Sequence, residues 1–187
     1  MATLRSYTAS LAAGVSAAVE SVKPSAEGGL GTLEALIGDA YYYGHGVSRD
    51  YTQAVRWYRR AAENSNVMAQ STLGDIYYYG RGVPQDFVEA GEWWQLAAEE
   101  GMAVAQLNLG VMYANGDGVA KDYVKSYLYT NLAAAHLPSG QDRDIAVKNR
   151  EIVAKLMSQT QIAEAQRLAR AWRPKSPQPL SERTHGD

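Results

Sequence analysis

The chain of 187 residues contains no cysteine. It therefore has no disulfide framework, no thiolate metal site and no cysteine nucleophile. It also lacks an apolar run of 18 residues, so no membrane span is expected. Neither sign of charge dominates, because 18 Lys and Arg nearly balance 20 Asp and Glu, and the longest basic run is Arg59-Arg60. Proteins that bind nucleic acid usually concentrate basic residues on one face, so we expect no nucleic-acid partner.

Phenylalanine is nearly absent, with one Phe against 13 Tyr and four Trp. Sixteen of these 18 aromatic residues lie between residues 41 and 129. Hydrophobic residues make up 46% of the chain, which is enough for the core of one domain. The clustering of the aromatic residues, most of them Tyr, therefore calls for an explanation in the pattern of the sequence.

The sequence repeats itself three times at a spacing of 36 residues. Residues 30–65, 66–101 and 102–137 align without a gap, and the first two units agree at 14 of 36 positions and the last two at 13. Unrelated segments would agree at about two, so the repeat is clear. Positions that agree throughout hold Gly, Tyr, Val, Asp and an alanine doublet: Gly38/Gly74/Gly110, Tyr41/Tyr77/Tyr113, Gly44/Gly80/Gly116, Gly46/Gly82/Gly118, Val47/Val83/Val119, Asp50/Asp86/Asp122 and Ala61-Ala62/Ala97-Ala98/Ala133-Ala134.

Each unit is predicted to form two helices joined by a glycine turn. The first helix of the second unit has apolar residues on one face: Ala69, Leu73, Ile76 and Tyr77. It should stop at Gly80 and Gly82, because glycine readily adopts left-handed backbone conformations. The second helix should bury Ala90, Trp93, Ala97 and Ala98, and Gly101 should end it.

Aspartates are predicted to cap the second helices. Asp86 with Glu89, and Asp50 with Gln53, have the spacing of a capping box, whereas the third unit has Lys125 at the second position. We therefore assign Asp50, Asp86 and Asp122 to capping. Asp39 and Asp75 also recur, on the first helices, and capping does not explain them.

Small residues at fixed positions predict close helix packing. We expect Gly74 and the alanine doublets to let two helix backbones approach, while Tyr77 and Trp93 fill the space between repeats. A hairpin of 36 residues cannot bury its apolar face alone, whereas stacked hairpins can. The predicted fold class is therefore an all-α solenoid.

The second unit carries the pattern A-Q-x-x-L-G-x-x-Y-x-x-G-x-G-V-x-x-D-x-x-x-A-x-x-W-x-x-A-A almost whole, from Ala69 to Ala98. This pattern resembles the Sel-one-like repeat (SLR), a relative of the tetratricopeptide repeat (TPR). The tetratricopeptide repeat itself is shorter and lacks the G-x-G-V turn. The resemblance implies a right-handed α-solenoid over about residues 30–137. It also implies adaptor roles in bacterial signalling, envelope assembly or host contact.

The outer units depart from the pattern. The first has Leu33-Glu34 where Ala-Gln is usual and Asn64-Ser65 where Glu-Gly is usual, which suggests a degenerate repeat that acts as an N-terminal cap. The third has Ser126, Tyr129 and Thr130 where Ala and larger aromatic residues stand earlier, and it ends at a helix-breaking Leu-Pro-Ser-Gly, residues 137–140.

The flanking segments divide the rest of the chain. Residues 1–29 are expected to be a short or frayed amphipathic helix rather than a signal peptide, since Ser and Gly interrupt their apolar stretch. This favours a cytoplasmic location and leaves a periplasmic or secreted one open. Residues 138–172 are predicted to form a capping hairpin of two helices, from Arg143 to Met157 and from a capping box at Ser158 and Gln161 to Trp172. Residues 173–187 are predicted to be disordered.

The sequence contains no hydrolase motif and no phosphate-loop motif. His45 stands in a glycine turn where the other units have Arg81 and Asp117, so we interpret this position as variable and solvent-facing. His136 and His185 form no pair with metal-ligand spacing. We therefore predict no catalytic residue, no metal and no cofactor.

A stripe on the first helices is the candidate partner-binding surface. A helical wheel places three residues of each unit beside the core-facing side: Leu36, Asp39 and Tyr43; Thr72, Asp75 and Tyr79; Asn108, Val111 and Asn115. The resemblance to tetratricopeptide-like solenoids implies that first helices line a concave face. Tyr beside Asp or Asn suits protein or peptide recognition, because Tyr adds apolar area with one polar group.

The alternative for the tyrosines is that Tyr42, Tyr43, Tyr78 and Tyr79 pack against the neighbouring repeat, Tyr42 and Tyr78 in particular. The sequence favours a non-enzymatic scaffold that binds a protein or peptide of unknown identity. Two alternatives remain: a cell-wall or β-lactam hydrolase, as proposed for some relatives, and a structural or regulatory subunit that uses the convex face or the basic C-terminal helices.

Overall fold

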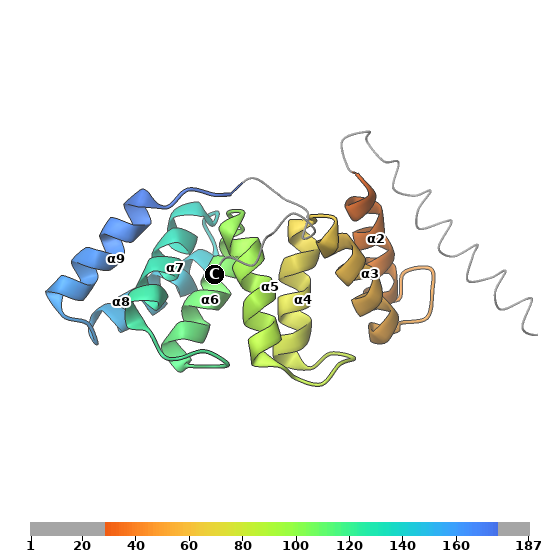
Figure 1. The fold of residues 1–187 in the computed structure, drawn as a ribbon, viewed down its shortest axis with the longest axis horizontal. Helices are drawn as coiled ribbons and strands as arrows, with labels where there is room; N and C mark the ends of the chain where they lie inside the picture. The colour runs from red at the N-terminus through yellow and green to blue at the C-terminus, as the bar shows by residue number, and fades with distance from the viewer. Residues whose placement is uncertain (1–28, 176–187) are drawn as a thin grey trace, which may run out of the picture.

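A computed structural model describes residues 29–175, and this part of the chain forms eight α-helices without a strand. In Figure 1 the helices follow one another in chain order along the long axis of the molecule. Their bounds are α2 (Leu30–Tyr43), α3 (Tyr51–Glu63), α4 (Val67–Tyr79), α5 (Phe87–Glu99), α6 (Ala103–Asn115), α7 (Tyr123–His136), α8 (Gln141–Ala154) and α9 (Gln159–Ala171). The helix expected within residues 1–29 and most of the predicted tail lie outside the described residues.

The first six helices form three hairpins. We call α2, α4 and α6 the A helices, and α3, α5 and α7 the B helices. Each A helix packs against the B helix of its own hairpin, and each B helix packs against the A helix that follows. One apolar core runs through all three hairpins, which confirms the predicted all-α solenoid. None of the helices within residues 29–175 is long and apolar enough to cross a membrane.

The predicted ends of the A helices are confirmed. Gly44, Gly80 and Gly116 cap them with left-handed φ angles of 77°, 65° and 82°, and each amide donates to the carbonyl of the residue four positions earlier. An aspartate then begins each B helix, as predicted. Asp50, Asp86 and Asp122 all accept a hydrogen bond from an amide in the first turn.

The predicted capping boxes of α3 and α5 are not completed. The backbone amides of Asp50 and Asp86 donate to the carbonyl oxygens of Tyr41 and Tyr77 across the glycine turn, at 2.9 and 3.0 Å. These amides are therefore satisfied before a side chain three residues later could reach them. Glu89 instead accepts from the indole of Trp93 at 3.0 Å. The box predicted at the start of α9, between Ser158 and Gln161, is complete.

In the first two hairpins, an aromatic side chain rather than backbone fills the space beside the aligned helix glycine. A Cβ on Gly74 would lie 2.3 Å from the ring of Trp94, and one on Gly38 would lie 2.7 Å from the ring of Tyr58. The expected close approach of two backbones is found at other glycines: Gly110 lies against the backbone of Thr130 in the third hairpin, and Gly31 lies against the carbonyl oxygens of Ala61 and Asn64 in the first. Tyr58 and Trp94 therefore fill the first two hairpins, and Trp94 stands one position after the predicted Trp93. Trp93 is also buried.

Glu34 and Asn64, two residues at which the first repeat departs from the family pattern, contact each other. In the second and third repeats, Gln70 and Gln106 donate to the carbonyls of Ala62 and Ala98 in the preceding B helix. No preceding repeat lies within the described residues, so Glu34 at the same position turns to its own hairpin. Its carboxylate accepts from Arg60 at 2.8 Å and from Asn64 at 2.7 Å.

The last two helices follow the solenoid, but they do not pack along each other and so do not form the predicted hairpin. The first of them runs from Gln141 to Ala154 rather than from Arg143 to Met157. Both pack on α7, and they meet near their connecting turn, where Val153 and Ala165 share a small cluster with Tyr127. Residues 173–175 fall within the predicted tail and yet return to the solenoid. Lys175 donates its amide to the carbonyl of Glu99 and its ammonium to the carboxylate of Glu99, each at 2.7 Å.

Candidate functional site

The candidate stripe lies on the partly exposed side of the A helices. Tyr43 and Tyr79 are its most exposed large side chains, at 61% and 60%. Asn115 is also exposed, and the other six members are half-buried: Leu36, Asp39, Thr72, Asp75, Asn108 and Val111. All nine residues are therefore reachable from solvent to some degree.

The aspartates of the stripe have a structural role that the sequence left unexplained. Asp39 accepts a hydrogen bond of 2.6 Å from the hydroxyl of Tyr58, and Asp75 accepts one of 3.2 Å from the indole of Trp94. These donors are the same rings that fill the space beside the helix glycines. A buried ring with a polar atom needs such an acceptor. In the third repeat Thr130 replaces the ring and Val111 replaces the acceptor.

The stripe is continuous between the second and third repeats. The amide of Asn108 on α6 donates to Asp75 on α4 at 3.2 Å. Burial raises the pKa of Asp75, against the lowering effects of the Trp94 hydrogen bond and of the positive charge of Arg81. Asp75 therefore joins the two repeats through an acceptor that is partly removed from water.

The last stripe residue of each repeat lies beside the variable position of the following turn. The ring of Tyr43 stacks on His45 with centroids 5.5 Å apart. The guanidinium of Arg81 lies 4.9 Å from the ring centre of Tyr79. In the third repeat the amide of Asn115 donates to Asp117 at 3.1 Å. The turn position is thus part of the same surface, and its chemistry differs in each repeat.

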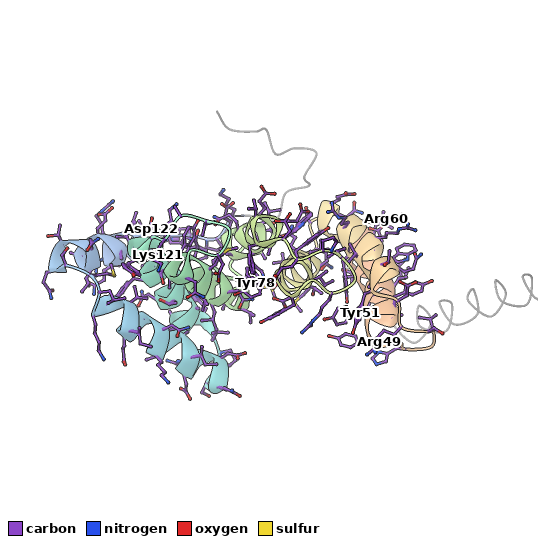
Figure 2. The ribbon with its side chains drawn as sticks, turned by 90° about the horizontal axis from the view of Figure 1, so that it is seen from below. Arg49, Tyr51, Arg60, Tyr78, Lys121 and Asp122 are labelled. Carbon is purple, nitrogen blue, oxygen red and sulfur yellow. The ribbon has the colours of Figure 1, made fainter. Side chains whose placement is uncertain are left out.

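Tyr42 and Tyr78 connect neighbouring repeats, as the alternative interpretation held for them. Arg81 of the second turn donates to the hydroxyl of Tyr42, and the hydroxyl of Tyr78 donates to Asp117 of the third turn at 3.1 Å. Burial, together with this hydrogen bond to a carboxylate, raises the pKa of Tyr78. In Figure 2 the label of Tyr78 marks the middle of the molecule, between the hairpins. Tyr43 makes no such contact and keeps its exposed face.

Sequence reasoning missed the residues one turn earlier on the same helix face. Met68 and Val104 stand four residues before Thr72 and Asn108, and they are 63% and 36% exposed. A wheel extended to the first turn of each A helix would have found them. The three A helices contain no Lys or Arg, so this face combines exposed apolar and aromatic groups with amides and two carboxylates.

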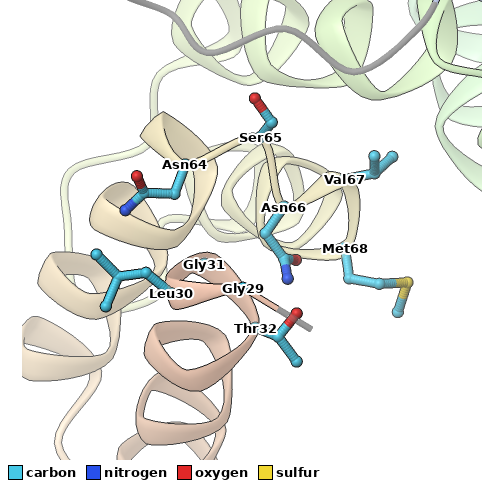
Figure 3. Close-up of a pocket in the computed structure, with 9 residues that line it drawn as sticks. All are labelled: Gly29, Leu30, Gly31, Thr32, Asn64, Ser65, Asn66, Val67 and Met68. Atoms are coloured by element: carbon cyan, nitrogen blue, oxygen red, sulfur yellow. The ribbon is translucent and has the colours of Figure 1, made fainter. Parts of the chain in front are cut away.

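The hollows elsewhere on the molecule offer little chemistry. Figure 3 shows one of about 460 Å³ where α2 begins beside the turn between α3 and α4, lined by Gly29–Thr32 and Asn64–Met68. None of these residues has an ionisable side chain. A second hollow, of about 610 Å³, lies between α7 and α9 and includes His136, Arg170 and Arg173 but no carboxylate. Within residues 29–175, no group of His, Asp and Glu side chains could hold a metal ion.

Comparison with known families decides what these hairpins are. The model of the Sel1 repeat matches residues 33–66, 67–102 and 103–136, which together are more than half of the chain. The chain belongs to the Sel1 repeat family. The matched segments coincide with the three hairpins and confirm the family that the glycine-turn pattern predicted.

Solved structures of Sel1 repeat proteins share this fold. A protective antigen of uropathogenic Escherichia coli strains, which displays an SLR fold, is 32% identical with a TM-score of 0.68, over 79% of this chain and 30% of the antigen. A Sel1 repeat protein from Oxalobacter formigenes is also 32% identical, with a TM-score of 0.60, over 74% of this chain and 95% of that protein. The chain thus spans less than a third of the antigen. No curated protein matches it.

Proposed function

We propose that this Sel1 repeat protein is a non-enzymatic scaffold that binds a protein or peptide segment on the A-helix face. Sel1 repeat proteins generally act as scaffolds for protein interactions. The observation that carries the proposal for this chain is the exposure of Tyr43 and Tyr79 at equivalent positions of two repeats. Neither ring fills the core, and each lies against a turn residue that differs between the repeats.

The composition of the face supports a peptide-like partner. Exposed Tyr and Met side chains supply contact area, and tyrosine also keeps one polar atom for a hydrogen bond. Half-buried amides such as Asn108 supply donors for a partner's backbone. The A helices have no basic residue, and two carboxylates of the face, Asp39 and Asp75, make no ion pair within the described residues. Arg81 of the second turn supplies one positive charge beside them. A neutral or basic segment with apolar side chains therefore suits it best.

The test compares three baits in affinity capture followed by mass spectrometry: the full chain, Tyr43→Ala/Tyr79→Ala, and Val88→Ala. Val88 is a matched control because it is 54% exposed on the B helix α5 and is not a member of the stripe. We expect the wild-type chain and Val88→Ala to capture the same partner and the double variant to lose it. Circular dichroism and thermal melting of each bait check that the variants are folded.

Two results would overturn the proposal. Capture of the same partner by the folded double variant would remove the A-helix face from the interaction and favour the convex face. Hydrolysis of a cell-wall or β-lactam substrate that persists through stringent purification would show that the protein is an enzyme.

A further inference from the structure

The outer side of α8 carries an apolar row that no other described element covers. Ile145, Ile152 and Leu156 are 38%, 48% and 58% exposed. They are spaced by seven and four residues, so they share one side of the helix and its C-terminal turn. In Figure 2, α8 forms the lower left edge of the molecule and stands out from the other helices.

The equivalent side of the preceding A helix is covered. Counted from the first residue of each helix, Ile145 and Ile152 correspond to Leu107 and Ala114 of α6. Leu107 packs in a cluster with α7 and α8, and Ala114 packs in the cluster that joins α7, α8 and α9. The row on α8 is therefore the side on which a solenoid normally receives its next helices. It stays open because α9 packs on α7 instead.

A charged row runs beside the apolar one. Asp144, Lys148, Glu151 and Lys155 are all exposed, follow one another at helical spacing, and make no ion pair within the described residues. When two identical helices pair antiparallel about a two-fold axis, the same edge of each helix faces the other. Asp144 then lies opposite Lys155 of the second copy, and Lys148 lies opposite Glu151 of the second copy. Every opposed pair has opposite charges.

We propose that α8 pairs two copies of this chain antiparallel, with Ile145, Ile152 and Leu156 at the centre and the four charges along one edge. The apolar row supplies the association energy, because it removes exposed aliphatic surface from water. The charged edge selects the antiparallel orientation, since complementary charges mainly determine specificity. The nine stripe residues lie on α2, α4 and α6 rather than on α8, so self-association and the proposed partner binding can be tested separately.

The first test measures the mass of the full chain by sedimentation velocity from low micromolar to high micromolar concentrations. We expect a monomer–dimer equilibrium for the wild-type chain and a monomer throughout for Ile152→Asp. Val88→Asp is the matched control, because it makes the same change at an exposed aliphatic residue of α5. It should dimerise like the wild-type chain. A wild-type monomer at every concentration, or equal behaviour of the two variants, would overturn the proposal.

The second test swaps charges and does not depend on a polar residue in the apolar row. Lys148→Glu places like charges opposite each other twice and should weaken dimerisation by about tenfold or more. Lys148→Glu/Glu151→Lys reverses both partners and should restore it. A single swap without effect, or a double swap that fails to restore dimerisation, would contradict the antiparallel pairing.

Discussion

Asp75 accepts hydrogen bonds from two side chains of different elements, the indole of Trp94 on α5 and the amide of Asn108 on α6. Trp94 is almost fully buried, and Asp75 is the acceptor of its indole N–H. The residue therefore serves the hairpin through Trp94 and the contact between repeats through Asn108. It also contributes to the surface that we propose for partner binding.

Substitutions of Asp75 should separate its role as an acceptor from its charge. Asp75→Ala leaves the Trp94 indole without a partner and should lower the free energy of unfolding by about 1–3 kcal/mol. Asp75→Asn keeps an acceptor oxygen and should cost much less at neutral pH. Urea denaturation at fixed pH measures both values, and equal losses for the two variants would show that the acceptor is not what matters.

The raised pKa of Asp75 adds a pH dependence with a definite sign. Burial raises the pKa in the folded state, so the folded chain binds this proton more readily than the unfolded chain does. The contribution of Asp75 to the free energy of unfolding therefore increases as the pH falls through the raised pKa toward the ordinary value of a carboxyl group. Asp75→Asn should lack this increase, so the stability difference between wild type and variant should change in the mildly acidic range. A constant difference would contradict it.

At the scale of the helical hairpin, the position of Glu34, Gln70 and Gln106 makes different contacts in the first repeat and in the later two. Gln70 and Gln106 bind the preceding repeat, whereas Glu34 binds Arg60 and Asn64 of its own hairpin. The Glu34 side chain is 2% exposed, while Arg60 is 58% exposed. The hairpin that has no earlier repeat among the described residues therefore closes its own end with a buried carboxylate and two donors.

Removal of Glu34 should weaken the first hairpin alone. Glu34→Ala deletes two hydrogen bonds to a buried carboxylate, which should cost about 1–3 kcal/mol locally. Because each repeat contacts only its neighbours, hydrogen exchange should speed up in α2 and α3 and stay unchanged in α6 and α7. Glu63→Ala, at an exposed glutamate in the last turn of α3, is the control and should leave exchange unchanged. Faster exchange in every helix would contradict local closure.

Helix boundaries were the part of the fold that could be predicted well from the sequence, because glycine C-caps and aspartate N-caps act within a few residues. The capping boxes predicted at Asp50 and Asp86 were wrong, because the amides of these residues bind the carbonyls of Tyr41 and Tyr77 across the turn, which the spacing along the helix does not reveal. The same limit applies to Trp94. Its burial against Gly74 depends on how two helices are rotated toward each other, which spacing along one helix does not determine.

At the scale of the whole molecule, the C-terminal segment links parts that are distant in sequence. Trp172 follows α9, lies near His136 with ring centroids 6.0 Å apart, and packs against the main core. Lys175 then pairs with Glu99 at the end of α5. A solenoid normally has contacts between neighbours only, so this segment adds a connection between α9 and an earlier repeat.

Trp172→Ala should therefore reduce stability and cooperativity together. The ring is half-buried, so we expect a loss of about 2 kcal/mol, below the range for a fully buried Trp. The urea transition should also broaden, because the C-terminal segment loses part of its connection to the second repeat at Glu99 and Gly101. Val88→Ala, at an exposed aliphatic residue, should stay within about 0.5 kcal/mol of the wild-type chain. An equally small effect of Trp172→Ala would show that the C-terminal segment does not stabilise the solenoid.

The sequence by itself determined the repeat length, the order of helices and turns, the caps and the family. These features arise from local backbone preferences copied every 36 residues. The tertiary structure alone decided which aromatic rings fill the hairpins, why Asp39 and Asp75 recur, that Tyr42 and Tyr78 join repeats while Tyr43 stays exposed, and that α8 keeps an open apolar side. Each of these depends on the rotation and distance between helices, because a wheel places a residue on its own helix and says nothing about what lies opposite.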